Sequence, residues 1–363
     1  MVMIIDEIEG KDLVSVQECI AIMEDVFREI GSGRGVNRPR LRYSCPTQQT
    51  DAKYFANIHA GALPKYGVAA LRINSRLARE TVVGTKRVDF PNPTKRYWGH
   101  FLVYSLDTAE LLGIIVDGTI SPLRVAATTA VAAKALALKQ STILGLFGTG
   151  HQAKLHARAL AHVLPLLKEV KVYSPTRQHR DQFAEEFTGE LQIPVRSVDN
   201  SREAVRGSHV VCCATNSSEP VFNGADMEPG QLVTSIVNSD AVFQRAEVDR
   251  ETYRRSNLVI VNDRESIQAN RQRELLDPID QKILSWDRVV ELGEVVNNNS
   301  RGRRTPEDII YYKNNSGMAI QFAAMGKVML ERAKSKGIGK EVPGEWFSAD
   351  LAQWYAQGYF PAS

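Results

Sequence analysis

Four arginines stand in surroundings where a guanidinium needs a partner of opposite charge. Arg72 interrupts the apolar stretch "AALRINS", Arg124 directly precedes an alanine-rich segment, and Arg40 and Arg42 lie between two prolines. A buried charge is costly unless it is paired, and a guanidinium can hold a carboxylate through two parallel hydrogen bonds. The pattern therefore predicts a site that binds the carboxylate of a substrate. A salt bridge within the protein is the alternative for each arginine.

Asp240 is the candidate acid of this site. It follows the apolar stretch "LVTSIV", which is typical of a buried strand of a parallel sheet. Ligands of open α/β sheets bind at the carboxyl ends of the strands, so we expect Asp240 to face the substrate. An aspartate that only caps a turn is the alternative.

A glycine turn stands between the predicted strand "STILGLFG" and the predicted helix "HQAKLHARALAHVL". Its pattern is G-x-G-x-x-A. The first glycine permits a tight turn, the second lets the backbone approach a pyrophosphate, and the small alanine packs the helix on the strand. This context predicts dinucleotide binding, with a turn that holds no ligand as the alternative. The expected cofactor residues here are Gly148, Thr149, Gly150, His151 and Gln152.

The end of the next predicted strand bears on the choice between NAD and NADP. The segment "VKVYSPTRQHR" has Ser174, Thr176, Arg177 and Arg180 where NAD sites usually place an acidic residue. Hydroxyls and guanidiniums suit a 2′-phosphate, so the sequence favours NADP(H), with NAD(H) possible and a solvated helix start as the alternative. Four residues after later strands are expected to complete the cofactor site: Ala214, Thr215, Asn216 and Val237.

The elements that position these residues change in character along the chain. The first part predicts a helix from Leu13, strands at 68–78 and 100–118 with a turn inside the second, and an alanine-rich helix at 121–138. After Gln140, strands and helices alternate, which is typical of a doubly wound parallel sheet.

The change in pattern divides the chain into two predicted domains. We expect a Rossmann-like NAD(P)-binding domain at 136–314 and a second α+β domain built from 1–135 and 315–363. The chain is expected to be helical again from Thr305, which would be the N-cap.

Composition excludes several classes of protein. The formal net charge is only +3 over 363 residues, which argues against nucleic-acid binding, and no apolar stretch approaches the length of a membrane span. No signal peptide or metal-ligand cluster is predicted, so we expect a cytoplasmic protein without a metal.

His151 and His156 are interpreted as surface residues of the helix after the glycine turn. The four cysteines are interpreted as buried, reduced thiols: Cys19, Cys45, Cys212 and Cys213.

Several segments together resemble the ornithine cyclodeaminase/mu-crystallin family. They are "IVDGTISPLRVAATTAVAAKAL", "GLFGTGHQAKLHARAL", "VVCCATNSSEPVF", "LVTSIVNSDAVFQRAEVD", "ELGEVV" and "KNNSGMAIQFAA". They follow the order of the family over most of the chain after Asp107. The resemblance implies a homodimer with bound NAD(H) or NADP(H), whose split N-terminal domain forms both the dimer contact and the substrate pocket.

The resemblance also implies roles for the charged residues. Arg124 matches an arginine that binds the substrate carboxylate, Arg42 or Arg40 matches a second one, and Asp240 matches an aspartate that acts on the substrate nitrogen. A lysine usually completes the pocket, and Arg72 stands in its place. Arginine stays charged and cannot transfer a proton as lysine can, which weakens the case for ornithine cyclodeaminase activity itself.

Three functions follow. The first is an NAD(P)H-dependent ketimine reductase or amino-acid dehydrogenase that acts on a 2-imino or 2-oxo acid and transfers hydride to a C=N carbon. The second is a cyclodeaminase-type lyase with tightly bound NAD. The third is a crystallin-like protein that binds NADP and a small ligand. We expect residues of the first hundred positions to decide which substrate side chain the pocket accepts. The candidates are Tyr43, His59, Arg76, Tyr97 and Trp98.

Overall fold

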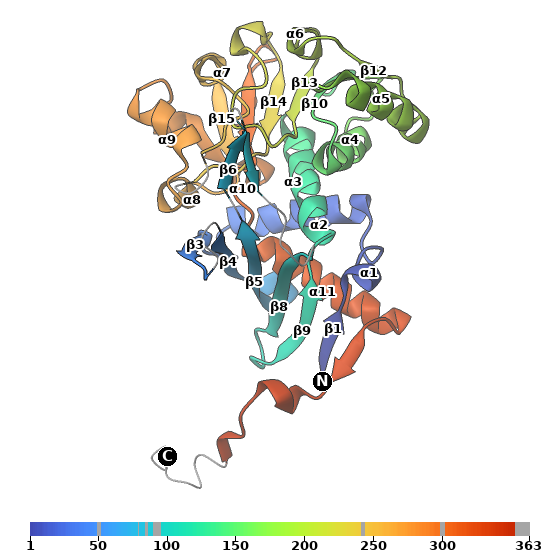
Figure 1. Cartoon of the computed structure of the whole chain (residues 1–363), viewed down its shortest axis with the longest axis vertical. Helices are drawn as coiled ribbons and strands as arrows, with labels where there is room; N and C mark the ends of the chain where they lie inside the picture. Colours follow the sequence, from blue (N-terminus) through green and yellow to red (C-terminus); the bar gives the residue numbers. More distant parts are fainter. Residues whose placement is uncertain are drawn as a thin grey trace.

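The computed structural model describes residues 1–48, 52–78, 80–83, 86–89, 96–240, 244–297 and 302–352. Its strands form two eight-stranded sheets and a two-stranded hairpin. The large sheets lie one above the other along the long axis of the molecule, with helices between and around them (Figure 1).

The first sheet combines both ends of the chain. Its order is β18-β1-β9-β8-β5-β4-β2, with β3 pairing to β4 beside this path. The pairs are antiparallel except for β1 with β9. The strands are β1 (Val2–Ile5), β2 (Val36–Asn37), β3 (Leu41–Pro46), β4 (Lys53–Leu63), β5 (Val68–Ala78), β8 (Trp98–Ser105), β9 (Leu111–Val116) and β18 (Lys340–Val342). The hairpin consists of β6 (Glu80–Val83) and β7 (Lys86–Asp89).

The second sheet is parallel throughout, as the alternation of strands and helices predicts. Its order, β12-β11-β10-β13-β14-β17-β15-β16, runs outward in both directions from β10, which makes it a doubly wound sheet. The strands are β10 (Ile143–Phe147), β11 (Glu169–Tyr173), β12 (Val195–Ser197), β13 (Val210–Cys213), β14 (Leu232–Ser235), β15 (Leu258–Val261), β16 (Val289–Glu291) and β17 (Ile310–Lys313).

Helices cover both sheets. They are α1 (Glu7–Gly10), α2 (Val16–Gly31), α3 (Ile120–Leu136), α4 (His151–Val163), α5 (Arg177–Leu191), α6 (Ser201–Val205), α7 (Arg250–Arg255), α8 (Glu265–Ala269), α9 (Arg273–Asp280), α10 (Leu292–Val296) and α11 (Ala319–Lys336). Single 3₁₀ turns occur at Pro64–Tyr66, Gly224–Asp226, Trp286–Arg288 and Gly344–Phe347.

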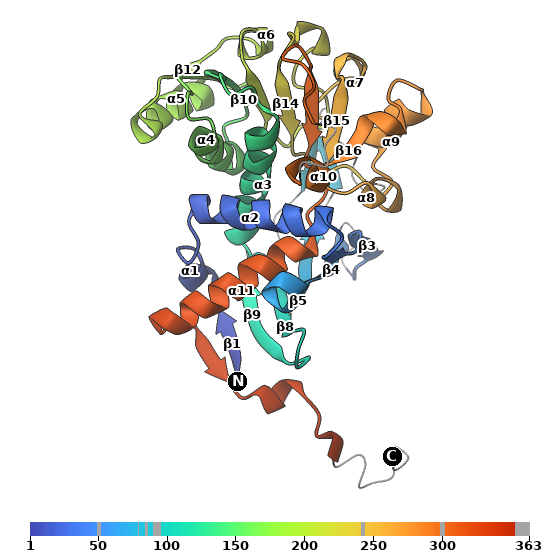
Figure 2. The ribbon, with the colours of Figure 1, turned by 180° about the vertical axis from the view of Figure 1, so that it is seen from behind.

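Helix α2 confirms the amphipathic helix predicted near Leu13. A capping box starts it, because the hydroxyl of Ser15 accepts from the backbone N–H of Glu18 while the carboxylate of Glu18 accepts from that of Ser15. Its apolar face is buried at Met23, Val26 and other positions. Figure 2 shows α2 and α11 lying across the middle of the molecule, where they contact each other.

The alanine-rich helix α3 links the two halves of the molecule, and it packs on both α2 and α4. Its small side chains let α4 approach closely, and this corrects the interpretation of His156 as a surface residue. His156 is fully buried, with Nε2 3.1 Å from the hydroxyl of Thr129 and Nδ1 2.8 Å from the carbonyl of Gln152. Burial lowers the pKa of His156 to about 4.

The expectation of a continuous helix from Thr305 is wrong. Residues Ile310–Lys313 form β17, a fully buried strand between β14 and β15, and the helix begins only at Ala319. The run of β-branched and aromatic residues suits a strand that is covered on both faces. The carboxylate of Asp308 accepts from the backbone N–H groups of Arg304 and Thr305, so this segment forms a turn.

Cysteine burial matches the expectation at three positions only. Cys19, Cys212 and Cys213 are buried, whereas Cys45 is exposed near the end of edge strand β3.

Within the described ranges no helix is long and apolar enough to cross a membrane, and no group of histidine, cysteine or acidic side chains could hold a metal ion.

Candidate active site

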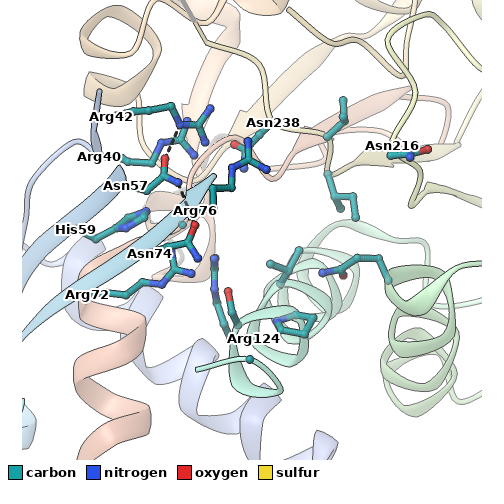
Figure 3. A pocket seen from close by; sticks show the side chains of 18 of the residues that line it. Arg40, Arg42, Asn57, His59, Arg72, Asn74, Arg76, Arg124, Asn216 and Asn238 are labelled. Carbon is teal, nitrogen blue, oxygen red and sulfur yellow. Dashed lines mark hydrogen bonds between the residues drawn. The ribbon is translucent and has the colours of Figure 1, made fainter. Parts of the chain in front are cut away.

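A cavity of about 440 Å³ lies where β3, β4 and β5 of the first sheet face the carboxyl ends of β13 and β14 of the second. Figure 3 shows arginine, asparagine and histidine side chains reaching into it from the strands on one side, with Arg124 of α3 below them and Asn216 across the space. The cavity therefore joins the predicted carboxylate-binding residues to the predicted cofactor site.

Strand alternation places the polar side chains on one face of the first sheet. Arg72, Asn74 and Arg76 follow each other at every second position of β5, and all three line the cavity. Asn57 and His59 of β4 stand opposite Asn74 and Arg72 in the antiparallel register.

Arg40 and Arg42 both contact Asp240, and both line the cavity. Arg40 Nη2 lies 3.0 Å from Asp240 Oδ2, and Arg42 donates to the same oxygen and to Asn57. Side chains of Arg40 and Asp240 are only 4% and 5% exposed. Burial, with repulsion from Arg40, lowers the pKa of Arg42 to about 9. The contact fixes Asp240 directly behind Arg40 and Arg42, which line the cavity, whereas Asp240 itself is not among the lining residues.

Arg72 and Arg124 form the other charged part of the site. Arg72 donates from Nε to Asp117 at 2.5 Å and from Nη2 to the hydroxyl of Tyr97 at 2.8 Å. Arg124 donates to the neutral side chain of Gln321 at 3.1 Å. The guanidiniums of Arg72 and Arg124 lie 5.0 and 5.1 Å from the centre of the Phe322 ring, and Arg124 is close enough to Arg72 to feel its charge.

Burial leaves Arg124 poorly compensated. Its Nε atom has no hydrogen-bond partner among the described residues. Desolvation, with repulsion from Arg72, lowers its pKa to about 10. A carboxylate between Arg72 and Arg124 would restore the missing partner, and both residues line the cavity.

The glycine turn has the shape that a dinucleotide requires. Gly148 has a φ of +103°, and a Cβ there would lie 2.6 Å from the carbonyl oxygen of Ala214. A Cβ on Gly150 would meet nothing within 4 Å. The N-cap of α4 is Gly150, which has no side chain to occupy the first N–H groups of the helix, so these N–H groups suit a phosphate. Gln152 lines the cavity, and its buried Oε1 has no partner among the described residues.

The proposed 2′-phosphate region is less open than expected. Arg180 is buried, and it donates to the carbonyl of Ser174 at 3.1 Å and to Asp199 at 2.8 Å. Arg177 has a side chain that is 80% exposed, with a long contact of 3.3 Å to Asp181. Thr176 is the N-cap of α5 and makes no side-chain cap bond.

Glu247, which the sequence did not single out, holds the two other segments that are predicted to bind the cofactor. Its buried carboxylate accepts from the backbone N–H groups of Thr215, Ile236 and Val237 and from the Thr215 hydroxyl, at 2.7–2.9 Å. The buried Lys313 donates to the carbonyl of Val237 at 2.5 Å. Thr215, Ile236 and Val237 all line the cavity. No local pattern reveals this role, because a glutamate in a loop is usually exposed.

Other expected residues divide between the cavity and the surface. Asn216, His59, Arg76 and Tyr97 line it, whereas Ala214 is buried behind Gly148. Thr149 is half-buried and His151 is exposed at the start of α4. Tyr43 is exposed and packs against Tyr54, and Trp98 lines a separate hollow with Ile8. Lining residues that were not expected are Asn57, Asn74, Gly118, Ser121, Pro122, Val125, Ile236, Asn238, Arg245 and Gly317.

The chain is similar to several known proteins over most of its length. The chain is 26% identical to an uncharacterized cyclodeaminase of Sinorhizobium fredii, over 89% of this chain and 92% of that protein. It is 23% identical to a Delta(1)-pyrroline-2-carboxylate reductase of Bacillus cereus, over 94% and 99% of the two chains.

A solved structure shares the fold. The Delta(1)-pyrroline-2-carboxylate reductase of Thermococcus litoralis, solved with NADH and L-proline, superposes with a TM-score of 0.80 at 25% identity, covering 94% of this chain and all of that one. The sequence profile of one family matches residues 73–337, which is most of the chain. The chain belongs to the ornithine cyclodeaminase/mu-crystallin family.

Proposed function

We propose that this chain is an NAD(P)H-dependent reductase of 2-imino acids. The observation that carries the proposal is the single cavity that brings Arg72 and Arg124 to face Gln152, Thr215 and the rest of the glycine-turn region. A carboxylate held by the arginines would place the adjacent C=N carbon toward the cofactor side. The Thermococcus relative, which holds NADH together with an amino acid, supports this arrangement.

Arg72 and Arg124 would fix the substrate through its carboxylate. Arg72 is itself held by Asp117 and Tyr97, so its guanidinium is oriented before the substrate arrives. Arg124 has a neutral partner and gains the most from an anion. Preorganised charges of this kind position the reacting carbon without a cost in reorganisation.

Asp240 would act at the substrate nitrogen. The two guanidiniums of Arg40 and Arg42 hold its carboxylate directly behind the lining of the cavity. A carboxylate beside an imine nitrogen favours the protonated iminium, which accepts hydride more readily than the neutral imine. The bound cofactor supplies the hydride, and addition to the iminium carbon then gives the amine without a further proton.

We further propose that NADP(H) is preferred over NAD(H), with Ser174, Thr176 and Arg177 near the 2′-phosphate. Two observations support this preference. The guanidinium of Arg177 is exposed, and the hydroxyl of Thr176, the N-cap of α5, makes no cap hydrogen bond to the helix. Arg180 acts only indirectly, because Asp199 and Ser174 hold it. In Arg177→Gln, KM for NADPH should rise about tenfold while KM for NADH stays within about twofold. Equal effects on both cofactors would refute the assignment.

We propose that two such chains form a cytoplasmic homodimer, with domains at 136–314 and at 1–135 plus 315–363. Ile8 and Trp98, which are 75% and 53% exposed, border one hollow on the first sheet and support a contact there. Four free cysteines suit a reducing compartment. Light scattering should give twice the mass of 40.4 kDa for the native chain and less for Trp98→Glu. A monomeric native chain would refute the dimer.

The activity is tested by cofactor absorbance at 340 nm. NADPH and NADH are offered with a cyclic imine such as piperideine-2-carboxylate, and with a panel of 2-oxo acids plus ammonium or methylamine. Oxidation that depends on the imine supports the reductase. Ammonia release from ornithine without net oxidation would instead indicate the lyase, and tight cofactor binding with no turnover would indicate a binding protein.

A further inference from the structure

His59 is a buried side chain of the cavity to which the proposed reaction gives no task. It stands in the middle of β4 and is only 2% exposed, yet it lines the cavity. Its Nδ1 atom has no hydrogen-bond partner among the residues that the structure describes. A polar nitrogen that is buried without a partner costs folding free energy, so His59 stands where a ligand can supply the missing hydrogen bond.

The ring of Phe322 brings His59 together with two arginines. The centroids of the His59 and Phe322 rings lie 6.2 Å apart. The guanidiniums of Arg72 and Arg124 lie 5.0 and 5.1 Å from the centre of the same Phe322 ring. His59 also stands directly opposite Arg72 in the antiparallel register of β4 and β5, which puts both side chains on one face of the sheet (Figure 3). His59 is therefore next to the arginines that are proposed to hold the substrate carboxylate.

The imidazole of His59 is neutral in this site. Burial lowers its pKa well below the usual value, and the positive charges of four arginines lower the pKa further. These arginines are Arg72, Arg40, Arg124 and Arg42. A neutral imidazole has an N–H donor on one nitrogen and a lone pair on the other. It can therefore donate to an anion without adding to the repulsion among the guanidiniums.

The two arginines use part of their donors within the protein. Arg72 donates from Nε to Asp117 and from Nη2 to Tyr97. Arg124 donates from Nη1 to Gln321. A carboxylate has about four lone-pair sites that accept hydrogen bonds. A carboxylate held by these two guanidiniums can therefore accept a bond from a third side chain as well, and an imidazole N–H is a suitable donor.

We propose that His59 is a third substrate-binding residue, whose ring donates an N–H hydrogen bond to the 2-carboxylate held by Arg72 and Arg124. This rests on the proposed reductase function. His59 binds and orients the substrate and transfers no proton, since it stays neutral near pH 7. A ring that only fills space in the core is the alternative, and the two roles differ in what the loss of the imidazole does to stability and to binding.

Replacing the imidazole by an apolar side chain of similar size separates these roles. His59→Leu removes the unpaired nitrogen, so the free energy of unfolding of the unliganded protein should stay the same or increase in urea unfolding. The Kd of pyruvate, titrated by calorimetry in the presence of NADP⁺ or NAD⁺, should rise about tenfold. A less stable His59→Leu whose Kd for pyruvate stays within about twofold would show a packing role and overturn the inference.

Two further variants complete the comparison. His162→Leu is the control, because it makes the same change at an exposed position of α4 and should alter neither the stability nor the Kd. His59→Gln keeps a neutral N–H donor, so its Kd for pyruvate should stay within about threefold of the native value. A loss of affinity in His59→Gln as large as in His59→Leu would contradict a hydrogen bond from this position.

A second probe locates the hydrogen bond on the substrate. Propanoate has the carboxylate of pyruvate but lacks its 2-oxo group, so His59→Leu should raise the Kd of both acids by a similar factor. A rise for pyruvate alone would place His59 at the C2 group and overturn the assignment to the carboxylate.

The titrations need no turnover, so they separate this inference from the reductase function. If no 2-imino acid oxidises the cofactor, the proposed function fails, and the Kd values still decide the role of His59. If the reductase is confirmed, His59→Leu should raise KM for the 2-oxo acid about tenfold and leave the Kd for NAD(P)H within about twofold. An unchanged KM in an active His59→Leu would overturn the inference while the reductase stands.

Discussion

Replacing Glu247 by glutamine should loosen both cofactor segments at once. The carboxylate accepts four hydrogen bonds, two at each oxygen, from Thr215 and from Ile236 and Val237. A glutamine keeps one accepting oxygen and presents an NH₂ group to the donors at the other. Two charge-assisted bonds are therefore lost, each worth about 1.5 kcal/mol at least, so the free energy of unfolding should fall by about 3 kcal/mol.

The same change should weaken cofactor binding. Thr215, Ile236 and Val237 line the cavity, so their displacement should raise the Kd for NAD(P)H about tenfold or more. Urea unfolding measures the stability, and quenching of protein fluorescence measures the affinity. Glu219→Gln is the matched control, because Glu219 is exposed in the loop after β13 that also carries Thr215. If Glu247→Gln unfolds and binds like the control, Glu247 does not hold these segments and the reasoning is wrong.

Three further outcomes are expected. Asp240→Asn should lower kcat at least about a hundredfold in protein that circular dichroism shows to be folded; retention of kcat would remove Asp240 from the chemistry. Arg124→Met should raise KM for any 2-oxo acid about tenfold or more and leave the Kd for the cofactor within about twofold, by steady-state kinetics and titration; the reverse pattern would contradict its role. The pKa of His156 is lowered from 6.5 to about 4 in the folded chain, so the unfolded chain takes up the proton first as the pH falls. Stability should therefore be lost between pH 6.5 and about 4, by about 3 kcal/mol. His156→Asn should lack this part of the loss in urea unfolding at pH 7 and 4.5, and identical profiles for both proteins would refute it.

Local patterns predicted the parts of the site that are encoded locally. The glycine turn, the helix after it and the position of Asp240 beyond a parallel strand all follow from short segments with clear periodicity. The strand at 68–78 was also predicted from the sequence. Its side chains alternate between the two faces of the sheet, and this alternation puts Arg72 on the face that lines the cavity.

Contacts between distant segments could not be predicted in the same way. Asp240 meets Arg40 across 200 positions, and Arg124 meets Gln321 across 197. Strand β4 was missed because its cavity face carries Asn57 and His59, which break the apolar pattern of a half-buried strand.

Two errors share a physical cause. Tertiary packing, which a single sequence does not reveal, decides the outcome in both. Residues 310–313 pair with β14 on one side and β15 on the other, which makes them a strand. His156 is buried because α4 packs on α3, where the ring meets the hydroxyl of Thr129.

The transfer of deuterium tests the central claim most directly. The protein is given NADPH or NADH deuterated on the reactive face of nicotinamide C4, with a 2-oxo acid and ammonium, and the product is analysed by mass spectrometry. The account predicts an amino acid that carries one deuterium on its C2 carbon and an equal amount of oxidised cofactor. An amino acid without deuterium, or no oxidised cofactor with any 2-imino acid, would contradict it.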